Sequence, residues 1–217
     1  MRVDLAIDHF EAVDGLTLQQ GDPTFSEVFG PGSERYTPGA RGSALSHLRL
    51  WQSCLEQGQP ILIFEDDAII RHDINRVAAK GFETLHRDWD VILFGYNTDS
   101  ILTVDTARAR RTVTFPVKYP SEAMLLRNAM STSAVAFLRL HHAFGLCGYA
   151  ISPKGARILS KLCFPLDNRV LHITRIGRLR AITLGGMMNA AFSKVRAFAC
   201  YPPVVLSPND KATSTID

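Results

Sequence analysis

The 217-residue chain lacks several features that define particular protein classes. It contains no apolar run near the roughly 20 residues that span a bilayer, and its first residues lack the apolar stretch of a secretory signal. Lys and Arg number 24 against 21 Asp and Glu, and the resulting +3 is a smaller excess than dedicated nucleic-acid-binding proteins usually carry. We therefore expect a cytoplasmic protein without a nucleic-acid partner.

Cysteine is also scarce, and none of the four residues lies in a C-x-x-C pair. This spacing argues against a zinc knuckle or a thioredoxin-like motif. Because free cysteines are usually buried, we expect reduced core thiols, which fit a cytoplasmic location. The four are Cys54, Cys147, Cys163 and Cys200.

What is present is typical of one globular domain over residues 1–217, with 46% apolar and 21% charged residues. Apolar residues recur at helical spacing over 44–57 and 73–86, and short apolar runs at 61–64 and 91–95 have the length of buried strands. The alternation of helix and strand predicts an α/β fold with a mainly parallel central sheet flanked by helices.

Other segments carry weaker signals. The Gly-, Pro- and Ser-rich stretch 19–43 predicts a loop, with Ser43 as the N-cap of the helix that follows. Residues 112–118 predict at most an edge strand because they include a proline. Further strands are expected at 148–151 and 196–200, and a further helix at 153–162.

Polar clusters follow both central strands. Glu65, Asp66 and Asp67 close the first strand, and residues 95–99 follow the second. In open α/β sheets ligands bind beyond the carboxyl ends of strands, so we expect both clusters at the site. Each like-charged pair at about 4 Å costs roughly 4 kcal/mol in an effective dielectric near 20. Solvent, basic side chains or a divalent ion such as Mn²⁺ or Mg²⁺ must offset this repulsion.

Strand alternation places Glu65 and Asp67 on one side and Asp66 on the other. The first two could thus face one cleft, one holding a metal that grips substrate phosphates and the other accepting hydrogen bonds from a sugar hydroxyl. The alternative is a solvated acidic turn that caps the next helix. A phosphate-loop nucleotide hydrolase is excluded, because the nearest stretch, 39–43, lacks the required lysine.

Several stretches resemble glycosyltransferase family 25. The sequence Gly-Ser-Ala-Leu-Ser-His-Leu-Arg-Leu-Trp at 42–51, followed by Pro-Ile-Leu-Ile-Phe-Glu-Asp-Asp-Ala at 60–68, is similar to the family's first pattern. Gly-Tyr-Ala-Ile-Ser-Pro-Lys-Gly-Ala at 148–156 resembles its second signature. Phe-Glu-Ala-Val-Asp-Gly at 10–15 resembles the segment before its first loop.

The family includes bacterial lipopolysaccharide and lipooligosaccharide β-galactosyltransferases and collagen galactosyltransferase domains. The resemblance covers about 10–165, and a weaker similarity follows at 201–207 within the C-terminal part 166–217. It implies a GT-A fold and inverting, metal-dependent transfer of a hexose, usually galactose, from a UDP-sugar to a lipopolysaccharide or other surface-glycan acceptor.

The resemblance also implies roles for individual residues. Asp67 would hold the Mn²⁺ or Mg²⁺, and Glu65 and Asp66 would lie near the donor ribose or sugar. Ser46 and His47 match the family's Ser-His pair. We expect one of them to line the donor cleft and the other to hold the helix to the acidic strand.

Inversion requires a base that takes a proton from the acceptor hydroxyl. Asp167 matches an acidic position that often follows the second signature of the family, and Asp99 lies beyond the 91–94 strand. Both are candidate catalytic residues. Trp51 is expected in the core, because it lies on the apolar stripe of its helix.

Family members usually open with a strand that carries an Ile-Asn-Leu-like run and a nearby arginine, which help to form the nucleotide pocket. The present chain starts at the following segment, so we expect a glycosyltransferase that lacks this strand, and the missing strand weakens the case for nucleotide binding and activity. The alternative function is therefore a non-catalytic domain that binds a saccharide or a protein. A third hypothesis is a metal-dependent phosphoester hydrolase that uses the same carboxylates at 65–67.

Residues 169–180 alternate basic and apolar side chains and include Arg175 and Arg178. One interpretation is contact with an anionic acceptor, such as a phosphorylated lipid-linked saccharide, at the inner membrane surface. The other is an ordinary solvated face of a helix.

Overall fold

The computed structural model describes residues 7–18, 23–86, 88–173 and 176–208. Its helices are α1 (Pro23–Val28), α2 (Pro38–Gln57), α3 (Ile74–Thr84), α4 (Glu122–Ala129), α5 (Pro153–Cys163) and α6 (Leu184–Ala191), with 3-10 turns η1 (Gly15–Thr17), η2 (Ser33–Arg35) and η3 (Phe192–Lys194). Its strands are β1 (Ile61–Phe64), β2 (Ile69–Ile70), β3 (Val91–Gly95), β4 (Ile101–Asp105), β5 (Arg110–Thr114), β6 (Ala136–Ala143), β7 (Gly148–Ile151), β8 (Val170–Ile173), β9 (Gly177–Arg180), β10 (Ala197–Tyr201) and β11 (Val205–Leu206).

Within these residues the strands form a nine-stranded sheet in the order β1-β7-β3-β10-β6-β4-β5, with β11 paired to β2 and β3. Only the β3–β10 and β3–β11 pairs are parallel, and the others are antiparallel. The α/β class is confirmed, but the expectation of a mainly parallel sheet is wrong. Helices cover both faces of the central strands, and this burial makes them apolar whichever way they run, so their composition does not report direction.

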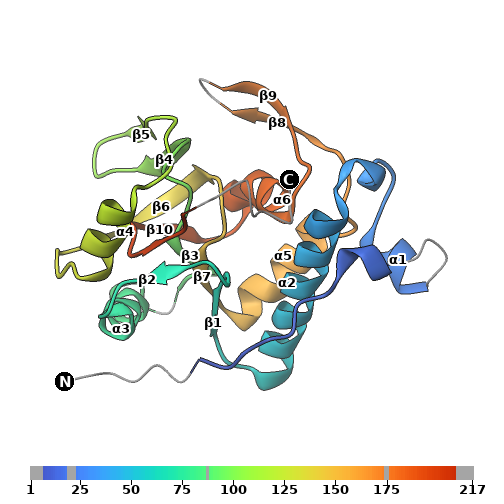
Figure 1. The fold of residues 1–217 in the computed structure, drawn as a ribbon, viewed down its shortest axis with the longest axis horizontal. Helices are drawn as coiled ribbons and strands as arrows, with labels where there is room; N and C mark the ends of the chain where they lie inside the picture. The colour runs from blue at the N-terminus through green and yellow to red at the C-terminus, as the bar shows by residue number, and fades with distance from the viewer. Residues whose placement is uncertain (1–6, 19–22, 87, 174–175, 209–217) are drawn as a thin grey trace.

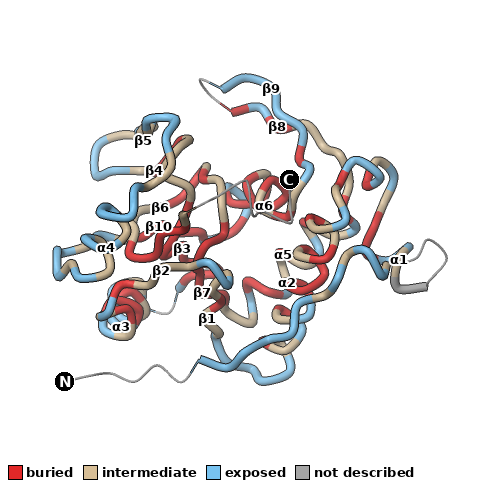
Figure 2. Tube along the Cα trace, viewed as in Figure 1, coloured by how far each residue is buried: buried red, intermediate tan, exposed pale blue. Residues whose placement is uncertain are grey.

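Two apolar cores lie on opposite faces of the sheet (Figure 1, Figure 2). Val91 and Leu93 of β3 pack with α2, α5 and α6, whereas Ile92 and Phe94 pack with α3. This alternation follows from the two-residue period of a strand. The carboxyl end of β3 is thereby held between two helical layers.

Helix α2 begins six residues before its expected start. Thr37 is the N-cap and accepts a hydrogen bond from the backbone of Ala40 (3.2 Å), and Pro38 occupies the first turn. Proline suits that position because its fixed φ is already helical and its missing N–H is not needed there. The predicted loop through residue 43 and the N-cap at Ser43 are therefore wrong.

The other expected elements are confirmed with small shifts in their ends. Strands β1, β3, β7 and β10 and helices α3 and α5 form where the apolar patterns place them, and β5 lies at the edge of the sheet. All four cysteines are buried and free, as expected. In the described part of the chain, no helix combines the length and the apolar character needed to cross a bilayer.

The basic stretch after residue 168 forms the β8–β9 hairpin rather than a helix. Gly177 opens β9 with a φ of +92°, a conformation that favours glycine. Arg175, which the sequence analysis singled out, lies outside the described residues.

Candidate functional site

The pairing of β7 brings the carboxyl ends of β1 and β3 to one place. Gly148, the first residue of β7, pairs with Phe64 on one side and with Gly95 on the other. The backbone N–H of Glu65 donates to the carbonyl of Cys147 (3.1 Å), which extends this pairing by one residue. The two polar clusters, 65–67 and 95–99, therefore meet at one edge of the sheet, as expected.

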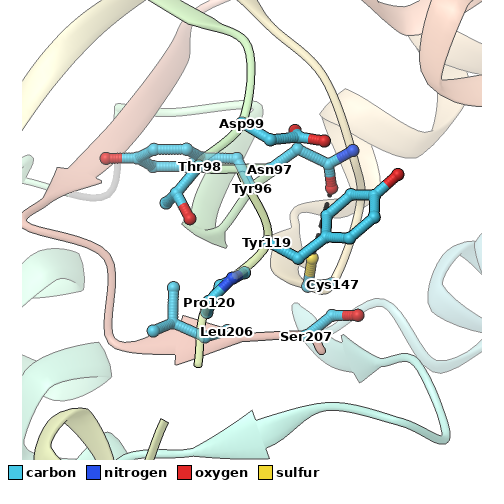
Figure 3. A pocket seen from close by; sticks show the side chains of 9 residues that line it. All are labelled: Tyr96, Asn97, Thr98, Asp99, Tyr119, Pro120, Cys147, Leu206 and Ser207. Atoms are coloured by element: carbon cyan, nitrogen blue, oxygen red, sulfur yellow. Dashed lines mark hydrogen bonds between the residues drawn. The ribbon is translucent and has the colours of Figure 1, made fainter. Parts of the chain in front are cut away.

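A small pocket lies at this edge (Figure 3). Residues after β3, residues before α4, the residue before β7 and the end of β11 line it together. The amide of Asn97 points toward Cys147, and its Oδ1 lies 3.9 Å from the thiol sulfur. The lining residues are Tyr96, Asn97, Thr98, Asp99, Tyr119, Pro120, Cys147, Leu206 and Ser207.

A glycine allows Asn97 to take this position. Gly145 has a φ of +79°, and a Cβ on it would lie 2.0 Å from Oδ1 of Asn97. The backbone N–H of Asn97 also donates to the carbonyl of Phe144 (2.7 Å). The close approach of these two segments thus depends on the missing side chain at position 145.

The acidic residues occupy a turn rather than a continuation of β1. The strand ends at Phe64, and the N–H of Ala68 donates to the carbonyl of Glu65 (3.1 Å). The predicted alternation of Glu65 and Asp67 across a strand therefore does not apply. Glu65 is partly buried, and Asp66 and Asp67 are exposed.

Asp67 is nevertheless fixed against the pocket wall. The hydroxyl of Ser207 donates to Oδ2 of Asp67 at 2.5 Å, and Ser207 lines the pocket at the end of β11. The chain carries β11 alongside both β2 and β3, so this contact joins segments 140 residues apart. The sequence analysis gave a solvated acidic turn as the alternative to a ligand site. That alternative fits Asp66 better than Asp67.

Negative charge converges on the start of β7. Burial, followed by the charges of Asp67 and Asp66, raises the pKa of Glu65 to about 7. The pKa of the Cys147 thiol is raised mainly by burial, and the carboxylates of Glu65, Asp67 and Asp99 add to the effect. Over the described ranges, Lys, Arg and His side chains form no ion pair with the three carboxylates of the turn.

The chemistry of this turn fits a divalent cation held in part by a ligand. The described residues contain no group of three His, Cys, Asp or Glu side chains that could hold a metal by themselves. Mg²⁺-like ions commonly bind one or two protein carboxylates and complete their shell with phosphate oxygens and water. The unpaired charge around Glu65 is what such an ion would neutralise.

His47 ties α2 to the sheet next to the site. Its Nδ1 lies 2.9 Å from the hydroxyl of Tyr149, and Nε1 of Trp51 lies 2.8 Å from the same oxygen. An indole can only donate, so Tyr149 accepts from Trp51, and its own proton is available for Nδ1 of His47. Burial lowers the pKa of His47 to about 4, which agrees with a neutral ring. Trp51 is fully buried, which confirms its expected place in the core.

Ser46 holds a different contact. Its hydroxyl accepts from the backbone N–H of Val13 (2.8 Å) and donates to the carbonyl of Gly42 (2.9 Å). It thereby fastens the N-terminal segment to α2. Neither Ser46 nor His47 is among the residues that line the pocket. His47 anchors α2 to β7 beside the acidic strand, and the structure does not bring Ser46 to the other candidates.

The two candidate bases lie in different settings. Asp99 lines the pocket beyond β3. Asp167 lies outside the pocket lining, and both its oxygens accept from Arg169, with Nε at 2.9 Å and Nη2 at 2.9 Å. These hydrogen bonds hold the pKa of Asp167 below its ordinary value. The structure thus brings together Glu65, Asp67 and Asp99, but not Asp167.

Sequence reasoning missed several pocket residues. Asn97 lay inside the polar cluster after β3, and Cys147 directly precedes the second family-like signature, so both had a positional signal. Ser207 ends the weaker family-like stretch 201–207, whereas Tyr119 had no signal, because the segment before α4 reaches the pocket only through the tertiary fold.

Comparison with known proteins identifies the family of the chain. A search of curated protein sequences found no significant match. The family model for glycosyltransferase family 25, described as an LPS biosynthesis protein, matches residues 2–170. This range includes α2, the acidic turn and the β7–α5 segment, and it covers well over half of the 217 residues. The chain therefore belongs to glycosyltransferase family 25, whose model is described as an LPS biosynthesis protein.

Proposed function

We propose that the chain is a metal-dependent, inverting glycosyltransferase with a GT-A-like fold, which moves a hexose from a UDP-sugar to a lipopolysaccharide or another surface glycan. Galactose is the first donor sugar to test. The observation that carries the proposal is that the acidic turn and Asp99 meet at one pocket. Ser207, which holds Asp67, lines it together with Asp99 and Cys147, and the backbone of Glu65 bonds to Cys147. This pocket lies beyond the carboxyl ends of β1 and β3, where α/β sheets bind ligands.

Asp67 is assigned to a Mn²⁺ or Mg²⁺ ion, with Glu65 and Asp66 next to the donor. When bound, such an ion supplies positive charge that stabilises a departing diphosphate. The support is electrostatic, because burial and then the charges of Asp67 and Asp66 raise the pKa of Glu65, and no described basic side chain pairs with the turn. Ser207 would keep the Asp67 carboxylate in one orientation through its hydrogen bond.

Asp99 is the preferred base. It lines the pocket, whereas Asp167 lies outside the pocket lining. In the proposed step, the acceptor hydroxyl gives its proton to Asp99 while its oxygen bonds to the anomeric carbon of the sugar. The bond from that carbon to the diphosphate oxygen breaks, and the electron pair leaves with the UDP. Attack opposite to the leaving group inverts the configuration.

We assign residues 1–217 to one transferase domain, and we place this domain in the cytoplasm. Four buried free cysteines fit a reducing compartment.

Isothermal titration calorimetry of UDP-galactose and UDP-glucose, each with and without Mn²⁺, tests this function. We expect Mn²⁺-dependent binding of at least one nucleotide sugar, and loss of that binding in the Asp67→Ala variant. Absence of binding under all four conditions would instead support a non-catalytic binding domain. Release of phosphate from the nucleotide sugar without any acceptor would support a phosphoester hydrolase.

A further inference from the structure

Charge is distributed very unevenly along the chain. Residues 1–122 contain 18 Asp and Glu against 12 Lys and Arg, whereas residues 123–209 contain 11 Lys and Arg against a single acid, Asp167. That acid is already paired with Arg169. Two other cations of the basic half, Lys154 and Arg196, pair with aspartates of the acidic half. Residues 123–209 therefore contain almost no acidic side chains that could neutralise their own Lys and Arg.

The β8–β9 hairpin concentrates this charge on an exposed strand. In its register, His172 pairs with Arg178, and Val170 pairs with Arg180, so these side chains share one face. Leu171, on the other face, is buried against the main core. Every residue of β9 is exposed (Figure 2), and the hairpin projects from the body of the protein (Figure 1). No described carboxylate forms an ion pair with either arginine.

Apolar side chains are exposed on the same element. Ile176, Leu179 and Ile182 expose 41%, 38% and 50% of their surface. Ile176 lies two residues before Arg178 and Ile182 two residues after Arg180, whereas Leu179 pairs with Leu171 and therefore lies on the face opposite the arginines. We define the hairpin surface by five residues, namely His172, Ile176, Arg178, Arg180 and Ile182.

We propose that the hairpin surface docks on an anionic lipid bilayer. Apolar side chains at an interface gain by entering the boundary between headgroups and acyl chains, and nearby arginines gain by contacting lipid phosphates. Arginine suits this position because its long side chain can reach the headgroups while its stem stays in apolar surroundings. The hairpin and the residues that flank β9 supply both groups.

The same observations weigh against other occupants. A nucleic acid would use the cations for its phosphates, but would leave Ile176 and Ile182 without an apolar partner. A second copy of the chain docking hairpin to hairpin would place four arginines together without a described acid nearby. A bilayer satisfies both parts of the surface.

The proposal rests on the proposed function only for its purpose, which is to bring the pocket to lipid-linked glycan acceptors. The assay below contains no nucleotide sugar, metal or glycan. If the protein does not bind vesicles, the proposed transfer reaction is not contradicted. If the protein has no transferase activity, the vesicle-binding assay still gives a valid result.

Co-sedimentation of the full chain with vesicles tests the surface. One vesicle set is pure phosphatidylcholine and the other contains about a third phosphatidylglycerol. We expect binding to the anionic set that weakens as salt is raised. Because each cation near an anionic surface contributes about a fivefold factor, Arg178→Gln/Arg180→Gln should bind roughly 30-fold more weakly. Ile176→Ser/Ile182→Ser should also bind several-fold more weakly, with the charge unchanged.

The matched control is Arg108→Gln/Arg111→Gln, which removes the same charge from exposed positions near β5. We expect it to bind as the wild type does, within about twofold. The proposal is overturned if the wild type ignores anionic vesicles, or if both double arginine variants lose binding equally. It is also overturned if a short DNA duplex competes with the vesicles through the same two arginines, or if the hairpin variants change only the oligomeric state in sedimentation velocity.

Discussion

The hydroxyl of Tyr149 lies 2.9 Å from Nδ1 of His47, and this contact joins the middle of α2 to the strand that organises the site. Tyr149 is two residues after Cys147, which lines the pocket together with Asp99 and Ser207. The hydrogen bond from Trp51 completes a chain of three buried side chains. These residues hold the sheet and helix together while the acidic turn and the pocket face outward at the edge.

Replacing Tyr149 by phenylalanine should destabilise the fold. The variant leaves the buried donor of Trp51 and the ring nitrogen of His47 without their partner, which costs about 1–3 kcal/mol of unfolding free energy. Urea denaturation monitored by circular dichroism measures the change. Tyr201→Phe is the control, because Tyr201 is exposed and its substitution should change stability by less than about 0.5 kcal/mol. Equal stability of the two variants would show that the hydrogen-bonded chain is unimportant.

His47 should make the protein sensitive to acid. Its folded pKa of about 4 lies below its ordinary value of 6.5, so between these values the unfolded chain binds a proton that the folded chain does not. The free energy of unfolding then falls as pH drops through this window, by about 3 kcal/mol in full. His47→Gln removes this contribution, so its stability relative to the wild type should rise by about 2–3 kcal/mol between pH 7.5 and 4.5.

In the difference between the wild type and the His47→Gln variant, the contributions of the other titrating groups to the pH dependence of the unfolding free energy cancel. Glu65 is one of these groups, and its contribution has the opposite sign. A difference that stays constant from pH 7.5 to 4.5 would mean that the folded protein protonates His47 as readily as the unfolded chain.

Glu65→Gln should stabilise the metal-free protein at alkaline pH. The folded pKa of Glu65 is raised from 4.5 to about 7, so the folded chain keeps a proton that the unfolded chain releases in that window, and stability falls as pH rises through it. At pH 8 the charged carboxylate faces Asp67 and Asp66, and its removal should raise the free energy of unfolding by about 2–3 kcal/mol.

At pH 4 the Glu65→Gln variant and the wild type should be equally stable. Urea denaturation with a metal chelator at both pH values measures the effect. Glu56→Gln, at an exposed position on α2, serves as the control and should show no such pH dependence. A destabilised Glu65→Gln variant at pH 8 would contradict the inferred repulsion.

The roles of the two candidate bases can be separated by paired substitutions. Asp99→Asn should lower kcat by about 10²- to 10⁴-fold without a large change in stability, because the base acts on the acceptor proton. Asp167→Asn should keep kcat close to that of the wild type and lower the free energy of unfolding by about 1 kcal/mol, since it weakens a partly exposed pair with Arg169. The rate of UDP release from UDP-galactose with lipopolysaccharide present is the kinetic readout. The reverse pattern would assign the base to Asp167.

Local patterns predict the elements well where burial alone decides them. Residues 61–64 and 91–95 are apolar because helices cover both faces of the sheet, and the strands form there. The start of α2 was misplaced because Pro38 and Gly39 are turn formers in isolation, whereas after Thr37 the proline occupies the first helical turn. Strand direction was mispredicted because β7 inserts between β1 and β3 from a distant part of the chain.

The candidate site divides in the same way. The acids of the turn and Asp99 follow strands directly, so their sequence position indicates the correct edge. The contact of Ser207 with Asp67 depends on β11, which pairs with β2 and β3 only after the sheet has formed. Asp167 and Ser46 matched a family-like pattern, but the pattern does not show that their side chains hold other parts of the fold.

The most direct test is Mn²⁺ binding followed through the enhanced relaxation of water protons, with and without UDP. The central claim is that the turn closing β1 shares a cation with a diphosphate. It predicts weak Mn²⁺ binding to the protein alone, at least tenfold tighter binding with UDP, and loss of this gain in Asp67→Ala. Equal Mn²⁺ affinity with and without UDP, or an Asp67→Ala variant that binds as the wild type does, would contradict the claim.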